Sequence, residues 1–348
     1  MRKSLVLIFL ALAGCAIDFE RHYNQIDSDM IRPISYWFRN NYYGSSPETA
    51  PGDIAVLDIF FVGKRITLDD ITDFRVSWNV FTDGYGNLAP RGEEPLKLLR
   101  EPLLVDGMNG QILRLAFQIP PDILHNADVI PNDLSELSRN YRIGDISEIF
   151  GISKKADVLA QLENLAKNPE LQKSIPYEMG AMINGLAQIF SAQYQIYLDF
   201  KGDTPRTKMR NTARWHGRLR GVDGIYVNNN PEILREFDTL KISVSRTNVL
   251  DVEVSEKDTA MTLEQAFTTQ ITNIETYRSR WFFEGSAIRN KLDISQEMNV
   301  FRWTINAAGN AKVGDTGWVW LWVYDERLGV ANHPQGRDIV GFPIKFVE

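Results

Sequence analysis

Cysteine is almost absent from this sequence: Cys15 is the single one among 348 residues. An intrachain disulfide is therefore impossible, although an oxidising compartment permits disulfides without requiring them. Histidine is scarce as well. The four histidines are scattered and match neither an H-E-x-x-H pattern nor a Cys/His ligand spacing: His22, His125, His216 and His333. We therefore expect no metal site and no cofactor.

A net positive charge and the common nucleophile motifs are missing too. The formal net charge is −7, and it becomes about −9 if Arg2 and Lys3 are removed by processing. This acidity argues against nucleic acid as a partner, because nucleic acid favours a basic surface. Neither a Gly-x-Ser-x-Gly nor a Ser-x-x-Lys motif is present. We predict that the protein is not an enzyme.

The first fifteen residues form a targeting signal. Arg2 and Lys3 precede an apolar run from Ser4 to Leu12, which is far shorter than the roughly 20 residues of a membrane-spanning helix. Small residues then lead directly to Cys15 in Leu12-Ala13-Gly14-Cys15. A basic start, a short apolar run and a small-residue cleavage site are typical of a secretory signal peptide.

Leu12-Ala13-Gly14-Cys15 resembles the lipobox of bacterial lipoproteins. The resemblance implies cleavage before Cys15, acylation of Cys15 (palmitate among the chains), and a mature protein held in the bacterial cell envelope by its acyl chains. An acylated Cys15 leaves no thiol for redox chemistry. Ala16 follows the cysteine in place of Asp, which by the retention habit of enterobacterial lipoproteins implies the outer membrane. The alternative is an ordinary signal peptide with a chance cysteine.

The remaining chain has the composition of a folded protein. It is 44% hydrophobic and 11% aromatic, which is enough to bury a sizeable core. Its length fits two domains of about 150 residues each. We expect a signal peptide at 1–14, a linker at 15–50, a first domain at 51–230 and a second domain at 231–348, with the boundary at Asn228-Asn229-Asn230-Pro231.

Short strands bounded by turn residues recur along both domains. Residues 73–82 alternate apolar and polar side chains, the period of a half-buried strand. Further strand-like runs lie at 53–62, 111–119, 194–200, 211–219, 240–244, 249–254, 277–283, 299–305, 318–324 and 339–347. Such a pattern predicts a mainly β protein made of β-sandwiches.

One stretch breaks this pattern. Apolar residues recur at helical spacing in two segments, at Val158, Leu159, Leu162 and Leu165 and again at Met182, Ile183, Leu186 and Ile189. We interpret residues of about 122–191 as a helical insertion in the first domain.

The C-terminal part carries Arg280-Trp281-Phe282-Phe283, Phe301-Arg302-Trp303-Thr304 and Asp325-Glu326-Arg327-Leu328-Gly329. Together with Ala50-Pro51-Gly52-Asp53 and Val76-Ser77-Trp78, these segments resemble the tandem immunoglobulin-like domains of bacterial cell-envelope lipoproteins. The resemblance covers roughly 50–120 and 192–348. It implies two immunoglobulin-like β-sandwiches and a non-enzymatic binding or structural role, and it carries no catalytic residues.

Two constellations are candidate binding sites. Trp318, Trp320 and Trp322 share one face of a strand, where they could stack on sugar rings, or pack in a core. Arg214, His216, Arg218 and Arg220 point the same way in a strand. They could contact anionic headgroups or an acidic partner, or form a solvated face paired with carboxylates. We therefore expect an envelope protein or a glycan as a partner, besides the membrane through the acyl chains on Cys15.

A second function class remains open. A carbohydrate-active or peptidoglycan-directed enzyme could carry its site in the helical insertion, which offers Asp145, Glu148, Glu163 and Glu178. No spacing pairs these carboxylates, so we prefer the binding role.

Overall fold

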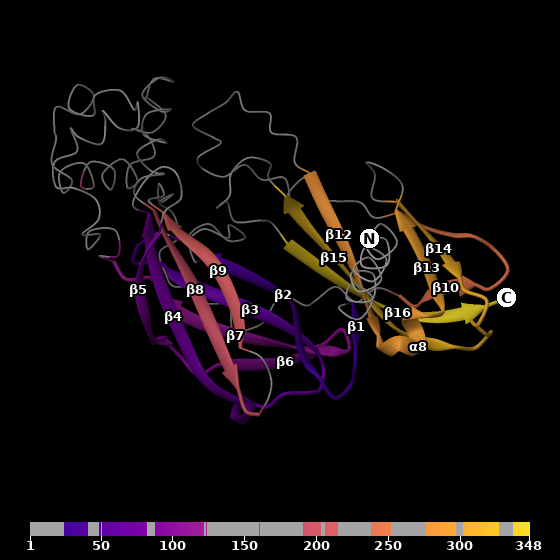
Figure 1. The fold of residues 1–348 in the computed structure, drawn as a ribbon, viewed down its shortest axis with the longest axis horizontal. Helices are drawn as coiled ribbons and strands as arrows, with labels where there is room; N and C mark the ends of the chain where they lie inside the picture. Colours follow the sequence, from indigo (N-terminus) through magenta and orange to yellow (C-terminus); the bar gives the residue numbers. More distant parts are fainter. Residues whose placement is uncertain are drawn as a thin grey trace, which may run out of the picture.

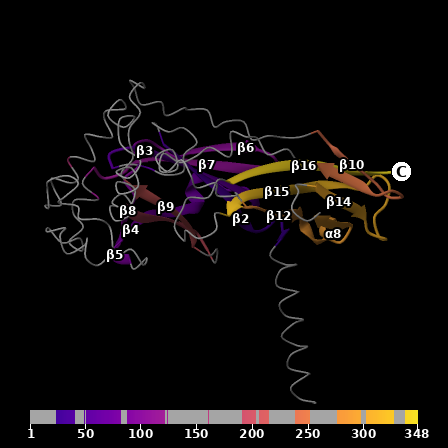
Figure 2. The same cartoon turned by 90° about the horizontal axis from the view of Figure 1, so that it is seen from above.

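We analysed a computed structural model of the chain. It describes residues 24–40, 49, 51–81, 88–121, 123, 160, 191–202, 206–214, 238–251, 276–296, 302–326 and 337–348. This part of the chain is mainly β and forms four sheets, which pack as two pairs. Figures 1 and 2 show the two sheet pairs side by side.

The N-terminal sheet pair contains two four-stranded sheets. One has the order β2-β3-β7-β6 and the other the order β5-β4-β8-β9. The strands are β2 (Ile31–Asn40), β3 (Ile54–Gly63), β4 (Ile71–Phe81), β5 (Leu88–Pro95), β6 (Leu103–Gly107), β7 (Gly110–Gln118), β8 (Ser191–Phe200) and β9 (Thr207–Arg214). A short 3-10 helix, η1 (Leu68–Asp70), precedes β4.

Alternating side chains of both sheets fill the space between them. Leu57, Ile59 and Phe61 of β3 enter this core, as do Ile196 and Leu198 of β8, and all of them are buried. Tyr194 lies at its centre, with its ring 5.2 Å from that of Trp78. Its hydroxyl oxygen accepts from Asn211 Nδ2 at 2.8 Å and lies 3.1 Å from Thr49 Oγ1. Burial raises the pKa of Tyr194, so the phenol stays protonated.

The C-terminal sheet pair contains a five-stranded sheet, β1-β12-β15-β16-β10, and a three-stranded sheet, β11-β14-β13. The elements are β1 (Gln25–Ile26), β10 (Leu240–Ser243), β11 (Asn248–Asp251), β12 (Thr276–Glu284), α8 (Gly285–Arg289), β13 (Leu292–Gln296), β14 (Arg302–Ala307), β15 (Thr316–Glu326) and β16 (Arg337–Val347). Trp281, Trp303 and Leu321 are buried between the two sheets.

A third buried cluster joins the pairs, and we call it the junction. It contains Ile34, Phe60, Val62, Met108 and Ile112 from the N-terminal side, and Ile26, Phe282, Trp320 and Ile339 from the C-terminal side. Phe60 and Val62 alternate with the inward residues of β3, just as Phe282 and Trp320 alternate with those of β12 and β15. The junction therefore brings together the outer faces of two sheets.

Most strands expected from alternation are present, and the prediction of a mainly β fold is confirmed. The segment expected to be a linker, 15–50, differs because it contains β1 and β2. β2 has Pro33 within it and a register shift between Pro33 and Ser35. An internal proline is tolerated at a sheet edge, which is where β2 lies. The predicted helical insertion lies outside the described residues, apart from Ile123, Ala160 and Ser191, the last being the first residue of β8.

Candidate functional site: the polar face of the N-terminal sheet pair

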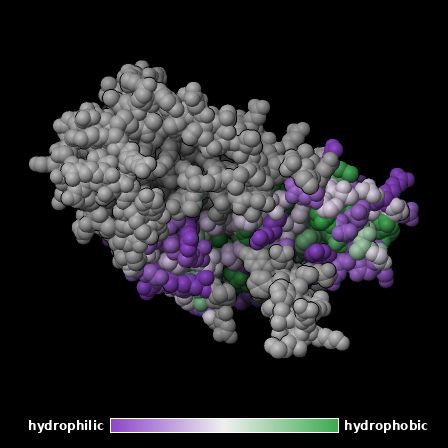
Figure 3. Space-filling view, turned by 45° about the horizontal axis from the view of Figure 1, so that its top comes forward, coloured by the Kyte–Doolittle hydropathy of each residue, from purple (hydrophilic) through white to green (hydrophobic). Residues whose placement is uncertain are grey.

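The outer face of the β5-β4-β8-β9 sheet is polar, and we call it the polar face. It arises from the alternation of β8, in which Gln195, Tyr197 and Asp199 point away from the core. The register places Arg75 of β4 and Lys208 of β9 on either side of Tyr197. On the side of the molecule seen in Figure 3, hydrophilic residues gather over the N-terminal sheet pair, and hydrophilic and hydrophobic residues are mixed over the C-terminal pair.

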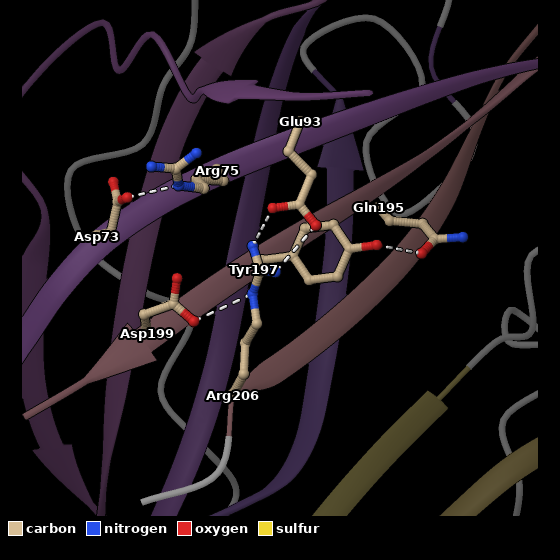
Figure 4. A network of polar contacts seen from close by, with 7 residues as sticks. All are labelled: Asp73, Arg75, Glu93, Gln195, Tyr197, Asp199 and Arg206. Atoms are coloured by element: carbon tan, nitrogen blue, oxygen red, sulfur yellow. Dashed lines mark hydrogen bonds and ion pairs between the residues drawn. The ribbon is translucent and has the colours of Figure 1, made fainter. Parts of the chain in front are cut away.

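Arg206 organises this face (Figure 4). Its guanidinium donates two hydrogen bonds to Glu93, at 2.9 and 2.6 Å, and its Nε lies 3.0 Å from Asp199 Oδ1. The same guanidinium carbon lies 3.9 Å from the ring centroid of Tyr197. A forked guanidinium suits both contacts, since it binds carboxylate in two places and stacks on an aromatic face.

The ionisation of these groups follows from their contacts. The hydrogen bond from Arg206 lowers the pKa of Glu93, and the same bond raises the pKa of Arg206. Both groups are therefore charged over a wide pH range. Tyr197 donates its hydroxyl hydrogen to Gln195 Oε1 at 2.7 Å, and Arg75 Nε bonds Asp73 at 2.6 Å. The side chains of the polar face are thus held in place before any partner arrives.

Charge is distributed unevenly across the polar face. Lys208 and Arg210 of β9 are exposed, and so is Glu93 of β5 at the opposite edge of the sheet. The pKa of Lys208 is lowered mainly by desolvation and further by repulsion from the positive charge of Arg210. The face thus presents a cationic edge, an anionic edge and an aromatic residue between them.

Charged groups of the polar face are paired with one another. Within the described ranges, no group of three His, Cys, Asp or Glu side chains could hold a metal ion. The carboxylates of Glu93 and Asp199 are engaged by Arg206. Preorganised charged groups lower the entropic cost of binding.

The predicted cationic stripe is only partly described. Arg214 is the last residue of β9 and pairs with Ser191, while His216, Arg218 and Arg220 lie outside the described residues. The cations that the structure does place on β9 precede that stripe. They are Lys208 and Arg210, and Arg206 lies directly before the strand.

The tryptophan row lies at the junction. Trp320 is 1% exposed, and its Nε1 donates to the carbonyl oxygen of Met108 at 2.8 Å. Trp318 and Trp322 are half-buried and pack against the same cluster. A sugar ring could stack on Trp320 only if the sheet pairs separated.

Met108 and Asn109 form the turn that meets this row. Both have positive φ, 49° and 54°, as the two central residues of a type I′ hairpin turn require. Met108 is fully buried, and Asn109 donates to Glu284 Oε1 at 3.1 Å. A buried methionine in this conformation indicates that packing across the junction outweighs the local backbone cost.

Sequence reasoning missed a second charged group. Asp58 of β3 is buried and accepts two hydrogen bonds from Arg114 of β7, at 2.6 and 2.8 Å, and one from Arg39 of β2. Burial lowers the pKa of the neighbouring Arg100. The only available signal was a charge within the apolar run of β3, which predicts a buried partner of opposite sign.

Tyr197, Asp199 and Glu93 were also missed as site residues. The alternation of β8 implied that Tyr197 and Asp199 lie opposite the core residues. The contact between Glu93 and Arg206 depends on the pairing of β4 with both β5 and β8, which a single sequence does not reveal.

Cys15 and its surroundings lie outside the described residues. In the described part of the chain, no helix combines the length and apolarity needed to cross a bilayer.

Comparison with known proteins gives distant likenesses only. No protein-family model and no curated protein matches the sequence. Among solved structures, the chain is similar to the N-terminal four immunoglobulin domains of Dscam1, at 12% identity and a TM-score of 0.17, covering 90% of this chain and 52% of that one. It is also similar to the complex of Dpr2 Ig1-Ig2 with DIP-Theta Ig1-Ig3, at 10% identity, a TM-score of 0.20 and coverage of 90% and 99%. Collagen adhesin from S. aureus gives 8% identity, a TM-score of 0.14 and coverage of 92% and 95%.

The chain spans about half the length of the Dscam1 fragment. TM-scores of this size carry no argument about fold or function.

Proposed function

We propose that the protein is a lipid-anchored, non-enzymatic binding protein of the bacterial cell envelope, made of two immunoglobulin-like sandwiches. The strand order supports the fold assignment. In the N-terminal pair the strands taken in chain order give sheets 1-2-6-5 and 4-3-7-8, which correspond to A-B-E-D and C′-C-F-G of an immunoglobulin domain. In the C-terminal pair, B-E-D corresponds to β11-β14-β13, and C-F-G to β12-β15-β16.

Two tryptophans support the same assignment. Trp78 lies on the C strand of the first sandwich and Trp281 on the C strand of the second, and both are buried. A buried tryptophan on strand C is a hallmark of immunoglobulin domains. The protein has no cysteine pair between strands B and F, so aromatic and aliphatic packing replaces the disulfide.

The observation that carries the binding role is the Arg206 network on the polar face. Its side chains are ordered by contacts with one another, yet they remain partly accessible on the outer face of the sheet. We infer that the partner is a protein with charges of both signs, because the cationic β9 edge and the anionic β5 edge lie on one surface. A sugar is disfavoured, since Arg206 already covers one face of Tyr197.

The test is capture from crosslinked envelopes by matched charge-reversal variants. Lys208→Glu with Arg210→Glu should reduce capture of the partner about tenfold, as expected when interface charges are reversed. Lys241→Glu with Arg246→Glu makes the same change in net charge at exposed sites of the other sheet pair and should leave capture unchanged. Equal capture by both variants would remove the polar face as the binding surface.

Membrane attachment requires its own test. The lipobox supports acylation of Cys15, and two or more chains at about 0.8 kcal/mol per buried methylene hold a protein stably. Cys15→Ser should release the protein into the soluble fraction. Fractionation of the membranes of the native protein should then place it in the outer membrane, as Ala16 implies. Full retention of Cys15→Ser on membranes would mean that another anchor exists.

A further inference from the structure

We propose that the acyl anchor holds the molecule by its middle, so that the bilayer lies alongside the junction and neither sheet pair serves as a stalk. This inference rests on the proposed acylation of Cys15. Its other support is the position of the first described residues, Asn24 to Ile31, relative to the two sheet pairs.

The chain enters the structure at the edge of the C-terminal sheet pair. Gln25 and Ile26 pair in parallel with Phe283 and Glu284 of β12, and the carbonyl oxygen of Asn24 accepts from the amide of Phe283 at 2.9 Å. Ile26 is 3% exposed and belongs to the junction cluster. The entry point is therefore fixed to the C-terminal pair.

The next residues are fixed to the N-terminal pair. The amide of Lys64 donates to the carbonyl oxygen of Met30 at 2.8 Å. A Cβ added at Gly63 would lie 2.2 Å from that oxygen and 2.7 Å from the carbonyl oxygen of Asp27, so the turn packs directly on the end of β3. Within a few residues the chain thus contacts both pairs, and in Figure 1 β1 lies between them.

The segment between Cys15 and Asn24, which we call the tether, is short. Nine residue steps separate Cys15 from Asn24, which span at most about 30 Å when fully extended. A flexible chain of that length has an average end-to-end distance of about 17 Å. A ten-residue strand such as β3 is about 33 Å long, so the tether cannot lift the junction by more than about one strand length.

Attachment at the junction differs from attachment at one end of the molecule. A tether attached at a distal tip would let one sheet pair stand between the bilayer and the other. An attachment at the junction keeps both pairs within reach of the membrane surface, and it directs them to either side of the anchor. The bilayer is then the surface that faces the molecule at the junction.

Energy transfer to labelled lipid tests this arrangement. The native protein uses its one cysteine for acylation, so a cysteine introduced elsewhere is the single free thiol for a donor dye. Suitable exposed positions are Asp29 beside the junction, Glu101 on the N-terminal pair and Arg246 on the C-terminal pair. Each acylated variant is incorporated into vesicles of phosphatidylethanolamine and phosphatidylglycerol that contain a rhodamine-labelled lipid.

We expect the donor at Asp29 to transfer most, and the donors at Glu101 and Arg246 to transfer less and to a similar extent. Transfer from either distal position that exceeds the transfer from Asp29 would mean that this sheet pair stands on the bilayer, which overturns the proposal.

A lengthened tether provides the control. Twenty Gly/Ser residues inserted after Asp18 leave β1 intact and raise the average tether length from about 17 to about 30 Å. Transfer from Asp29 should fall about twofold with this insertion. Unchanged transfer would show that the short tether does not position the junction. Failure of the anchor itself is seen separately, because a protein that is not acylated does not float with the vesicles.

Discussion

The two outer faces of the N-terminal sheet pair differ in what covers them. On the β2-β3-β7-β6 sheet, the outward residues Phe60, Val62 and Ile112 are buried against the C-terminal pair. On the β5-β4-β8-β9 sheet, the outward residues Gln195, Tyr197 and Asp199 are only half-buried. The same alternating backbone thus makes a buried contact with the C-terminal pair on one side and a polar, partly exposed face on the other.

The difference can be seen in the strands themselves. Nine of the ten residues of β3 are buried, so this strand is apolar on both faces apart from Asp58. β8 alternates buried and half-buried residues. A strand that is buried on both faces is nearly continuous in hydrophobicity, whereas a strand with one open face alternates. The sequence of a strand therefore indicates whether its sheet is covered.

The largest expected effect is at the junction. Trp320→Ala removes a buried indole and its hydrogen bond to Met108, and it should lower the free energy of unfolding by about 3–5 kcal/mol. Urea denaturation measures this change. Val313→Ala, at an exposed position of the same sheet pair, should cost less than about 0.5 kcal/mol. A loss below about 1 kcal/mol for Trp320→Ala would mean that the junction contributes little.

The turn that enters the junction should show a smaller effect. Asn109 has φ 54°, and asparagine tolerates this conformation better than alanine does. Asn109→Ala should cost about 1–2 kcal/mol through backbone strain and the loss of the bond to Glu284. Asn109→Gly loses the same bond but relieves the strain, so it should be closer to the native protein in thermal denaturation. If Asn109→Gly were less stable than Asn109→Ala, backbone strain would be excluded as the cause.

The ion pair between Lys291 and Asp315 in the C-terminal sheet pair predicts that stability depends on pH. The hydrogen bond from Lys291, at 2.8 Å, lowers the pKa of Asp315 below its ordinary value of 3.8. A carboxyl whose pKa is lowered by folding stabilises the protein above that ordinary value, and this contribution is lost as the pH falls through the folded-state pKa. Lys291→Met should therefore lower the melting temperature at about pH 6 but have little effect at about pH 2. The same decrease at both pH values would contradict the assignment.

The smallest effect on stability is expected on the polar face. Glu93→Gln weakens the two hydrogen bonds from Arg206, but both side chains are about one-third exposed and solvent replaces the contact. The denaturation midpoint should not change measurably, whereas capture of the partner should decrease. A large loss of stability would place the polar face among the structural contacts.

Much of this architecture could be predicted from the sequence because alternation follows directly from the pleat. The runs around Val76, Ile196 and Trp320 gave strands close to those observed. β2 lies in the predicted linker and β5 was not predicted as a strand, and both contain residues that disfavour strands, Pro33 in β2 and Pro90 and Gly92 in β5. Both are edge strands, where the lost amide donor costs little.

The candidate site was harder to predict. Sequence reasoning placed the tryptophans on one face of a strand, but whether that face is open depends on a second sheet from a distant part of the chain. The Arg206 network depends on register between β5, β4, β8 and β9. Local periodicity encodes neither whether another sheet covers a given face nor the register between paired strands.

The pairing of β1 with β12 also has a consequence for the order of folding. Ile26 and Glu284 are partners, although about 260 residues separate them along the chain. β1 leaves the ribosome long before β12 does. The N-terminal sandwich can be completed once β9 has emerged, but the edge of the five-stranded sheet closes only after most of the protein has been synthesised. The attachment of β1 to the folded body is therefore a late step in folding.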